Sequence, residues 1–116
     1  MDISKLISLP SAKCVIKHPL TGENTDIVIE LSGIDSSIFR KSAREIALDK
    51  ANGKDIGDGE VNLLARCTLS WENVELYGEQ LECTVENAMK IYSEVYTIKE
   101  QCENFISTKG NFFLNV

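Results

Sequence analysis

The feature that most constrains the fold is a change of hydrophobic period part-way along the chain. Between Thr25 and Leu31, apolar and polar side chains alternate, which is the pattern of a strand with one buried face. After position 35 the apolar residues recur three and four positions apart, the spacing of amphipathic helices. Strands that come first and helices that follow are typical of the α+β class. We therefore predict an N-terminal β-hairpin followed by a small bundle of about four helices.

The expected hairpin is the clearest local signal. Its loop, from His18 to Asn24, contains the Pro, Gly and Asn residues that turns select for their backbone geometry. The residues before it show little pattern, so we expect a flexible lead-in with room for one short helical turn. A length of 116 residues suits one domain. We expect a lead-in at residues 1–11, a single α+β domain at 12–113 and a C-terminal tail at 114–116. Within the domain, the hairpin should span residues 12–31 and the helical part residues 35–110.

Capping residues mark where the first two helices should begin and end. The first helix should start at Asp35, a good N-cap, with Ile34 and Phe39 forming a hydrophobic staple, and it should stop before Gly53. Its inward positions are Phe39, Ala43, Ile46 and Ala47. The second helix should run from about Gly59 to Ser70. Its buried side chains are Val61, Leu64, Cys67 and Trp71.

The remaining elements are marked in the same way. A small hairpin or an extended excursion is expected around Gly78, and Thr84 should cap the third helix. The segment from Thr97 to Glu100 has the form of a capping box, so a fourth helix should begin there and end at Gly110. The inward positions of these two helices are Val85, Ala88, Met89, Tyr92, Tyr96, Ile98, Cys102, Phe105 and Ile106.

Acidic residues are unevenly placed. The net charge is −6, and residues 72–103 alone carry −6, since eight glutamates there face two lysines. A basic segment at residues 40–54 precedes them. The acidic stretch either keeps the protein soluble or steers a partner or a second copy. Duplex nucleic acid is not an expected partner, because its binding depends on neutralising phosphates with Lys and Arg.

Residues that carry chemistry are few and scattered. His18 is the single histidine and lies in a turn, where a general base would be poorly supported. Cys14, Cys67, Cys83 and Cys102 lack metal-ligand spacing, and no phosphate-binding glycine motif is present. We expect reduced thiols that fill the core, with a redox-active or disulfide-linked thiol as the alternative. No catalytic site, cofactor, metal or membrane span is predicted.

Aromatic residues late in the chain need a separate explanation. Phe112 and Phe113 follow the predicted helix stop at Gly110, where a chain normally frays into water. Either this segment folds back and completes the core, or it offers an apolar surface to a partner. Trp71 poses the same choice between core and interface anchor.

Several short segments resemble, in order and spacing, the tail assembly chaperones of long-tailed, siphovirus-type bacteriophages. The resemblance covers residues 10–113. Its first half consists of Pro10, His18-Pro-Leu-Thr-Gly22, Asp26-Ile-Val-Ile-Glu-Leu31, Gly33, Asp35-Ser36 and Phe39-Arg40. Its second half consists of Leu63-Leu-Ala65, Trp71-Glu-Asn73, Thr84-Val-Glu-Asn-Ala88, Ile98-Lys-Glu-Gln101, Phe105-Ile106 and Asn111-Phe112.

The resemblance implies a non-enzymatic assembly factor. Such chaperones coat the long helical tape-measure protein, keep it soluble and help bring tail-tube subunits to it. They act in the host cytoplasm and leave before the virion is complete, and many are also made in a frameshifted, longer form. Two other classes stay open: a structural tail-completion or connector protein retained in the virion, and a small acidic inhibitor of a host protein.

We expect partner helices to lie in an apolar groove near the fourth helix and the residues that follow it. The candidate contact residues are Ile98, Phe105, Phe112, Phe113 and Trp71, with Glu100 and Glu103 as an acidic rim. The tape-measure protein and the tail-tube protein are the expected partners. Self-association through the oppositely charged segments is a further prediction.

Overall fold

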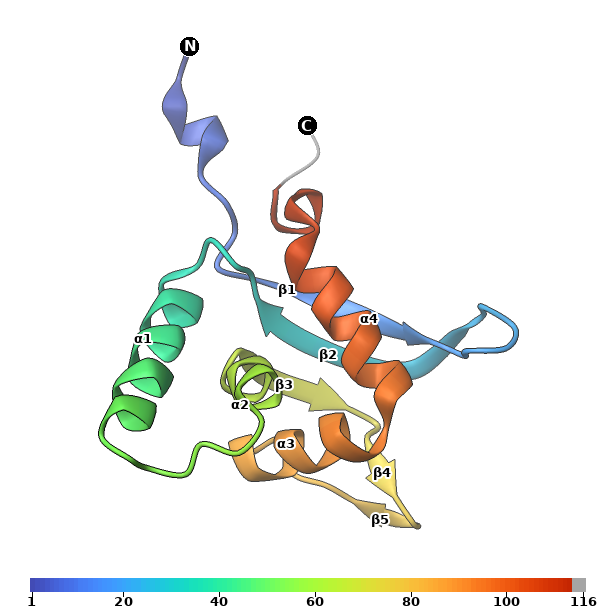
Figure 1. Ribbon diagram of the computed structural model, residues 1–116. Coiled ribbons are helices and arrows are strands. Elements are labelled where there is room, and N and C mark those ends of the chain that lie inside the picture. The colour runs from blue at the N-terminus through green and yellow to red at the C-terminus, as the bar shows by residue number, and fades with distance from the viewer. Residues whose placement is uncertain (114–116) are drawn as a thin grey trace.

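The computed structural model describes residues 1–113, so the expected tail at 114–116 lies outside the described residues. The predicted α+β class is confirmed, because an N-terminal β-hairpin precedes four α-helices within this part of the chain (Figure 1). The strands are β1 (Ser11–Lys17), β2 (Asn24–Ser32), β3 (Thr68–Glu72), β4 (Glu75–Leu76) and β5 (Glu79–Gln80). The helices are α1 (Ser37–Ala51), α2 (Gly59–Arg66), α3 (Val85–Glu94) and α4 (Tyr96–Ser107), with short 3-10 turns η1 (Ile3–Leu6) and η2 (Lys109–Phe112).

Strands β1, β2 and β3 form an antiparallel sheet with β2 at its centre. Cys14, Ile29 and Trp71 lie directly opposite one another across the three strands and therefore share one face. Helix α4 crosses this face (Figure 1). The other face carries Lys13 and Glu30, which pair across β1 and β2. The sheet thus has one apolar, covered face and one polar face, as the alternation of side chains indicates.

The predicted end of the second helix is wrong. Helix α2 ends at Arg66, and Thr68–Glu72 is instead a strand that pairs with β2. Threonine and tryptophan favour strands, and the open edge of β2 supplies hydrogen-bond partners that the helical spacing does not reveal. The Thr68 hydroxyl donates to the Leu64 carbonyl at 2.8 Å and closes the helix end.

The short-range turn predictions are confirmed. Strands β4 and β5 form the expected small hairpin, with Tyr77 at φ 50° and Gly78 at φ 83°. Two successive positive φ values are typical of the type I′ turn that suits a two-residue hairpin loop. Thr84 caps α3 by accepting a hydrogen bond from the Asn87 amide at 3.0 Å. Helix α1 stops just before Gly53, whose φ is 78°.

Two predicted helix starts are wrong by a small number of residues. The N-cap of α1 is Ser36 and not Asp35, because the Ser36 hydroxyl accepts the Phe39 amide at 3.1 Å. Helix α4 begins at Tyr96 without a side-chain cap, since a single residue separates it from α3. Thr97 therefore lies inside the helix, and the expected capping box does not form.

The core lies between the covered face of the sheet and helices α2, α3 and α4. Most inward positions predicted for α3 and α4 belong to it, but Val85, Tyr96 and the α1 residue Ala47 are exposed. Val85 and Tyr96 are the first residues of their helices, where the chain is still leaving a loop. Ala47 lies on α1, which contributes Phe39 to the edge of the core.

Phe112 belongs to the core, so the interpretation that the late aromatic segment folds back is the correct one. The η2 turn leaves Phe112 only 3% exposed, and its ring meets Phe105 edge-on with centroids 5.6 Å apart. A Cβ atom at Gly33 would lie 3.0 Å from the carbons of the Phe112 ring. A side chain at position 33 would therefore force the Phe112 ring to shift, so the close packing of this ring favours glycine here. Phe113 is partly buried.

We predict that Gly33→Ala lowers the free energy of unfolding by about 1–3 kcal/mol, because the new methyl group overlaps the packed Phe112 ring. Gly110→Ala is the matched control, since the space around its Cβ position is open, and it should change stability by less than about 0.5 kcal/mol. Urea denaturation followed by circular dichroism measures both. Equal losses in the two variants would contradict the packing described for Phe112.

Ser32→Ala should leave stability unchanged or raise it, because the buried Ser32 hydroxyl has no hydrogen-bond partner within residues 1–113. Thr68→Val removes a hydroxyl that is bonded to both the Leu64 carbonyl and the Tyr92 hydroxyl, so it should cost about 1–2 kcal/mol. Thermal unfolding of the two variants checks this order. A larger loss for Ser32→Ala than for Thr68→Val would show that the Ser32 hydroxyl makes a bond in solution.

Candidate partner-binding groove

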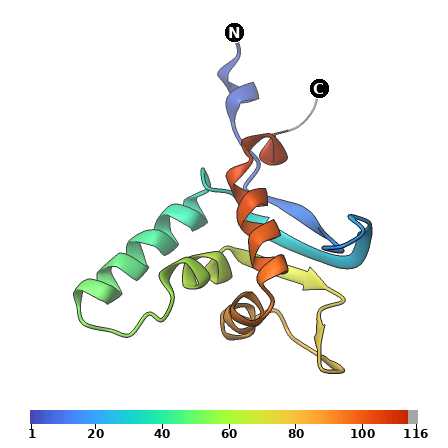
Figure 2. The same ribbon diagram turned by 45° about the vertical axis from the view of Figure 1, so that its right-hand side comes forward.

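A groove of about 200 Å³ opens between helices α1, α2 and α4. Figure 2 shows α1 and α4 diverging, with α2 between them. The apolar lining residues are Ile34, Phe39, Leu63, Leu64 and Ile106, and the polar ones are Glu60, Glu103 and Ser107. A concave surface with an apolar floor and a few charged groups at its edge is typical of a binding site.

Capping residues near the starts of α2 and α1 determine where these two helices begin beside the groove. Asp58 caps α2 by accepting the Glu60 and Val61 amides at 3.0 and 3.2 Å, which fixes where the helix begins. Ile34 and Phe39, which the sequence predicts to meet as a staple, both line the groove. With Ser36 as the N-cap, Ile34 and Phe39 lie at the N″ and N3 positions and not at the N′ and N4 positions that define a staple.

An ion-pair cluster joins α2 to α4 at the edge of the groove. The Lys99 ammonium lies 3.6 Å from a Glu60 carboxylate oxygen and 3.4 Å from one of Glu103. Desolvation opposes the charge on this ammonium, but the neighbouring carboxylates of Glu103, Glu60 and Asp58 outweigh it and raise the pKa of Lys99. Three carboxylates around one ammonium leave this edge negative. A cationic segment of a partner would complement it.

Helix α1, the outer wall, is attached to α2 through Arg66. The guanidinium lies 3.2 Å from Glu45 and 3.8 Å from Asp49, and its Nε donates to Asn62 at 2.9 Å. These ion pairs are partly exposed, and such pairs contribute little individually. Ile46, which is buried on the same helix, contributes the apolar part of the attachment. Helix α1 is thus anchored along α2, while Phe39 lines the groove.

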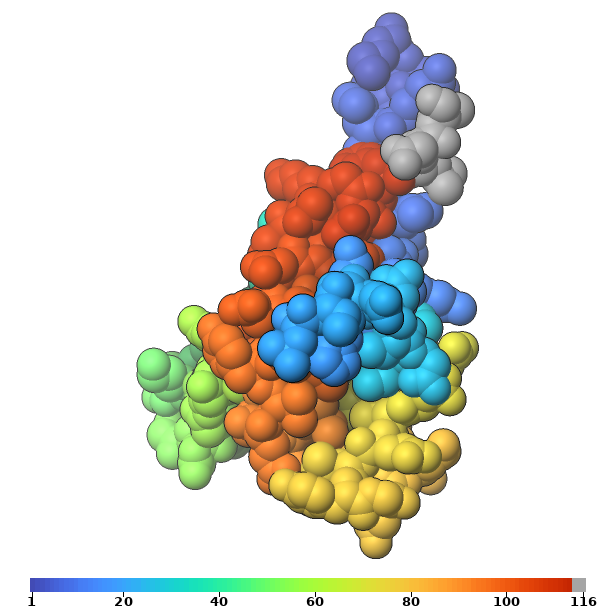
Figure 3. Space-filling model, turned by 90° about the vertical axis from the view of Figure 1, so that its right-hand side faces the viewer, coloured from blue at the N-terminus to red at the C-terminus, as the bar shows by residue number. Residues whose placement is uncertain are grey.

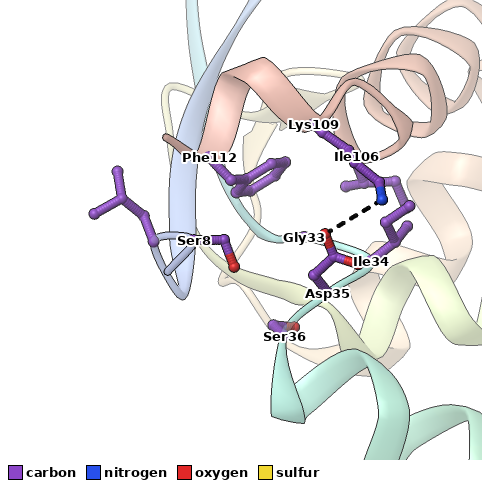
Figure 4. Close-up of a pocket in the computed structure, with 9 residues that line it drawn as sticks. Ser8, Gly33, Ile34, Asp35, Ser36, Ile106, Lys109 and Phe112 are labelled. Atoms are coloured by element: carbon purple, nitrogen blue, oxygen red, sulfur yellow. Dashed lines mark ion pairs between the residues drawn. The ribbon is translucent and has the colours of Figure 1, made fainter. Parts of the chain in front are cut away.

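A small cavity of about 10 Å³ adjoins the groove (Figure 4). Ile34 and Ile106 line both spaces. In the close-up, the Phe112 ring lies against Gly33, and a dashed line marks the ion pair of Lys109 with Asp35, whose charged atoms are 3.9 Å apart. A volume of this size holds about one water molecule. The cavity is therefore an extension of the groove floor and not a separate ligand site.

The predicted contact residues on α4 and η2 do not share one surface. Ile98 and Phe112 are 7% and 3% exposed, so both support the fold. Glu103 lies at the groove edge, whereas Glu100 is exposed elsewhere on α4. Phe105 lies on the other side of α4 from the groove, where it contacts the Phe112 ring.

The two other predicted contact residues lie outside the groove. Trp71 is partly buried on β3, and its indole Nε1–H donates to the Leu81 carbonyl at 2.8 Å. Phe113 is partly buried beside the η2 turn. Of the seven predicted contact residues, Glu103 lines the groove and Phe112 lines the small cavity that adjoins it.

The sequence did not single out Leu63 or Glu60 as site residues, although both line the groove. They lie three positions apart on α2 and therefore share one side of that helix. The sequence signal that could have indicated Leu63 is its position next to the buried Leu64. Two adjacent leucines give a helix an apolar face that is wider than the surface one packed neighbour covers, so part of that face stays exposed.

A second, shallower groove lies between α4 and β1, beside Phe105. Polar contacts already span it, because the Lys17 backbone N–H donates to the Gln101 side chain and the Gln101 amide donates back to the Lys17 carbonyl, each at 2.8 Å. The Gln101 amide thus occupies the edge of β1 in the way that another strand would. The groove between α1, α2 and α4 is the better candidate for a partner.

The cysteines with altered pKa values lie in or beside the core. The hydrogen bond with Cys14 and burial raise the pKa of Cys102, and burial raises the pKa of Cys67 to about 11. These thiols are buried and free, as the sequence predicts for core cysteines, while Cys83 is partly buried. His18 is exposed, and its Nδ1 accepts the Leu20 amide in the β1–β2 turn.

Two further observations concern residues 1–113. In this range no group of three or more His, Cys, Asp or Glu side chains is arranged to hold a metal ion. Nor does any helix in the described part of the chain combine the length and apolarity needed to cross a bilayer.

We base the functional assignment on the groove between α1, α2 and α4 and on the sequence itself. Neither a protein-family model nor a curated protein nor a solved structure matches this chain.

Proposed function

We propose that this protein is a tail assembly chaperone that holds helical segments of a tape-measure protein in the groove between α1, α2 and α4. The observation that carries the proposal is the composition of the groove, in which five apolar side chains form the floor and Glu60 and Glu103 lie at the edge. An amphipathic helix binds such a groove by laying its apolar stripe along the floor. Basic residues beside that stripe would meet the acidic edge.

The geometry supports the class of ligand, and the resemblance of the sequence supplies the partner. Apolar contacts are non-directional, so a groove of this kind accepts many helices that share a stripe but differ in sequence. A long helical tape-measure protein offers many such stripes. Because each chain would contribute this groove, many copies would coat one tape-measure protein.

Weak binding at each groove suits a chaperone that is later displaced. The groove volume of about 200 Å³ is below the range of about 300–1,000 Å³ that is usual for small-molecule sites. A partner helix would therefore insert only one or two side chains, with the rest of its surface left to the rim. Seven of the eight glutamates between positions 72 and 103 are exposed, so coated complexes would repel one another.

Co-expression with a tape-measure protein tests the proposal. The wild-type chain should increase the soluble fraction of the tape-measure protein, and Phe39→Ala/Leu63→Ala should lose most of this effect. Binding of a helical tape-measure segment, measured by isothermal titration calorimetry, should weaken by about tenfold or more, because two apolar contacts are removed.

Leu20→Ala/Tyr77→Ala is the matched control, since it removes one leucine and one aromatic side chain that are 90% and 91% exposed in hairpin turns. This control should behave as the wild type, and circular dichroism should show both variants folded. A folded groove variant that solubilises the tape-measure protein as well as the wild type would place the contact elsewhere. A wild-type chain that leaves the tape-measure protein insoluble would refute the function.

A further inference from the structure

Residues 1–7 form an N-terminal arm that projects from one end of the molecule (Figure 3). Its 3-10 turn leaves Ile3, Leu6 and Ile7 exposed at 75%, 59% and 71%. Side chains three positions apart lie above one another in a 3-10 helix, so Ile3 and Leu6 share one side of the arm. Ile7 continues the same segment. Exposed apolar clusters of this kind mark contact surfaces.

The root of the arm is fixed to the body of the protein. The Leu9 amide donates to the Phe112 carbonyl, and β1 begins at Ser11. From this root the arm runs away from α1, α2 and α4, as both ribbon views show (Figures 1 and 2). Entry into its own groove would need the arm to fold back on itself at Ser8 and Leu9, which line the small cavity beside that groove, and the Leu9 hydrogen bond to Phe112 holds the backbone there. The groove of another molecule is free of this constraint.

The arm and the groove are complementary in polarity and charge. The apolar side of the arm matches the floor formed by Phe39, Leu63 and their neighbours. Lys5 lies beside the apolar side chains of the arm, while the arm's carboxylate, Asp2, caps the start of the 3-10 turn and binds the Ser4 amide. The groove edge has three carboxylates around one ammonium. A cation next to an apolar stripe is the combination that suits this groove.

We propose that the arm of one molecule occupies the groove between α1, α2 and α4 of a second copy. This inference rests on the proposed function, because it assigns a regulator to the same groove. The arm of a neighbour covers the apolar floor until a helical partner displaces it. Self-association and partner binding are then mutually exclusive at each groove.

Sedimentation velocity over a concentration series tests the contact. The wild-type chain should self-associate, and Leu6→Ser/Ile7→Ser should raise the dissociation constant by about tenfold or more, because two apolar side chains lose their burial. The variant should retain the wild-type melting temperature, since none of the η1 residues is buried in the monomer. Leu20→Ser, which changes a leucine that is 90% exposed in the β1–β2 turn, is the control and should associate as the wild type does.

A mixing experiment identifies the two surfaces. Phe39→Ala/Leu63→Ala has an intact arm, and Leu6→Ser/Ile7→Ser has an intact groove. Each should be monomeric alone, and their mixture should form a one-to-one complex of one arm and one groove. A mixture that stays monomeric would overturn the proposal, as would a wild-type chain that is monomeric up to about 1 mM. Unchanged association of the arm variant would overturn it as well.

The arm contact and the chaperone function can fail separately. If the arm variant binds a tape-measure segment at least as tightly as the wild type while its self-association is lost, both proposals hold. Lost self-association without any binding of the segment would refute the function and leave the arm contact standing. Binding of the segment with unchanged self-association would refute the arm contact alone.

Discussion

A single apolar cluster holds the rest of the structure in place. It lies between the covered face of the three-stranded sheet and helices α2, α3 and α4, with Ile29 and Leu31 fully buried at its centre. Burial of one such side chain contributes about 1.5–3 kcal/mol, more than an exposed ion pair provides. The cluster fixes one side of α4 against the sheet. The opposite side of α4 is thereby left to form a wall of the groove.

The groove exists because α1 takes little part in that cluster. Helix α1 packs along α2, and Phe39 reaches only the edge of the core. The radius of gyration of 15.1 Å exceeds the value of about 13 Å expected for a compact domain of this length. The excess agrees with the arm, which projects in Figure 3, and with α1, which extends from the body of the molecule in Figure 2. The outward position of α1 thus accounts both for the uncovered apolar side chains of the groove and for part of the extended shape.

Most predictions that rested on local signals succeeded, although the caps predicted at Asp35 and Thr97 were wrong. The loop between β1 and β2, the turn at Gly78 and the cap at Thr84 each depend on a handful of neighbouring residues, whose backbone preferences act within a few positions. Prediction failed at Thr68–Glu72, because this segment follows a helix closely and pairs with a strand about 40 positions earlier in the chain. The choice between core and interface for Phe112 likewise depended on Gly33, a residue distant in sequence that leaves room for the ring.

The sequence by itself determined the type and order of most elements, the excess of acidic residues between positions 72 and 103, and the covered face of the first hairpin. These properties follow from side-chain period, capping and charge, which are read along the chain. The tertiary structure decided that β2 acquires a third strand, that Phe112 is core, and that Ile34, Phe39, Leu63 and Ile106 meet in one groove. Helical spacing shows which side of a helix is apolar, but only packing in three dimensions shows which part of that side remains uncovered.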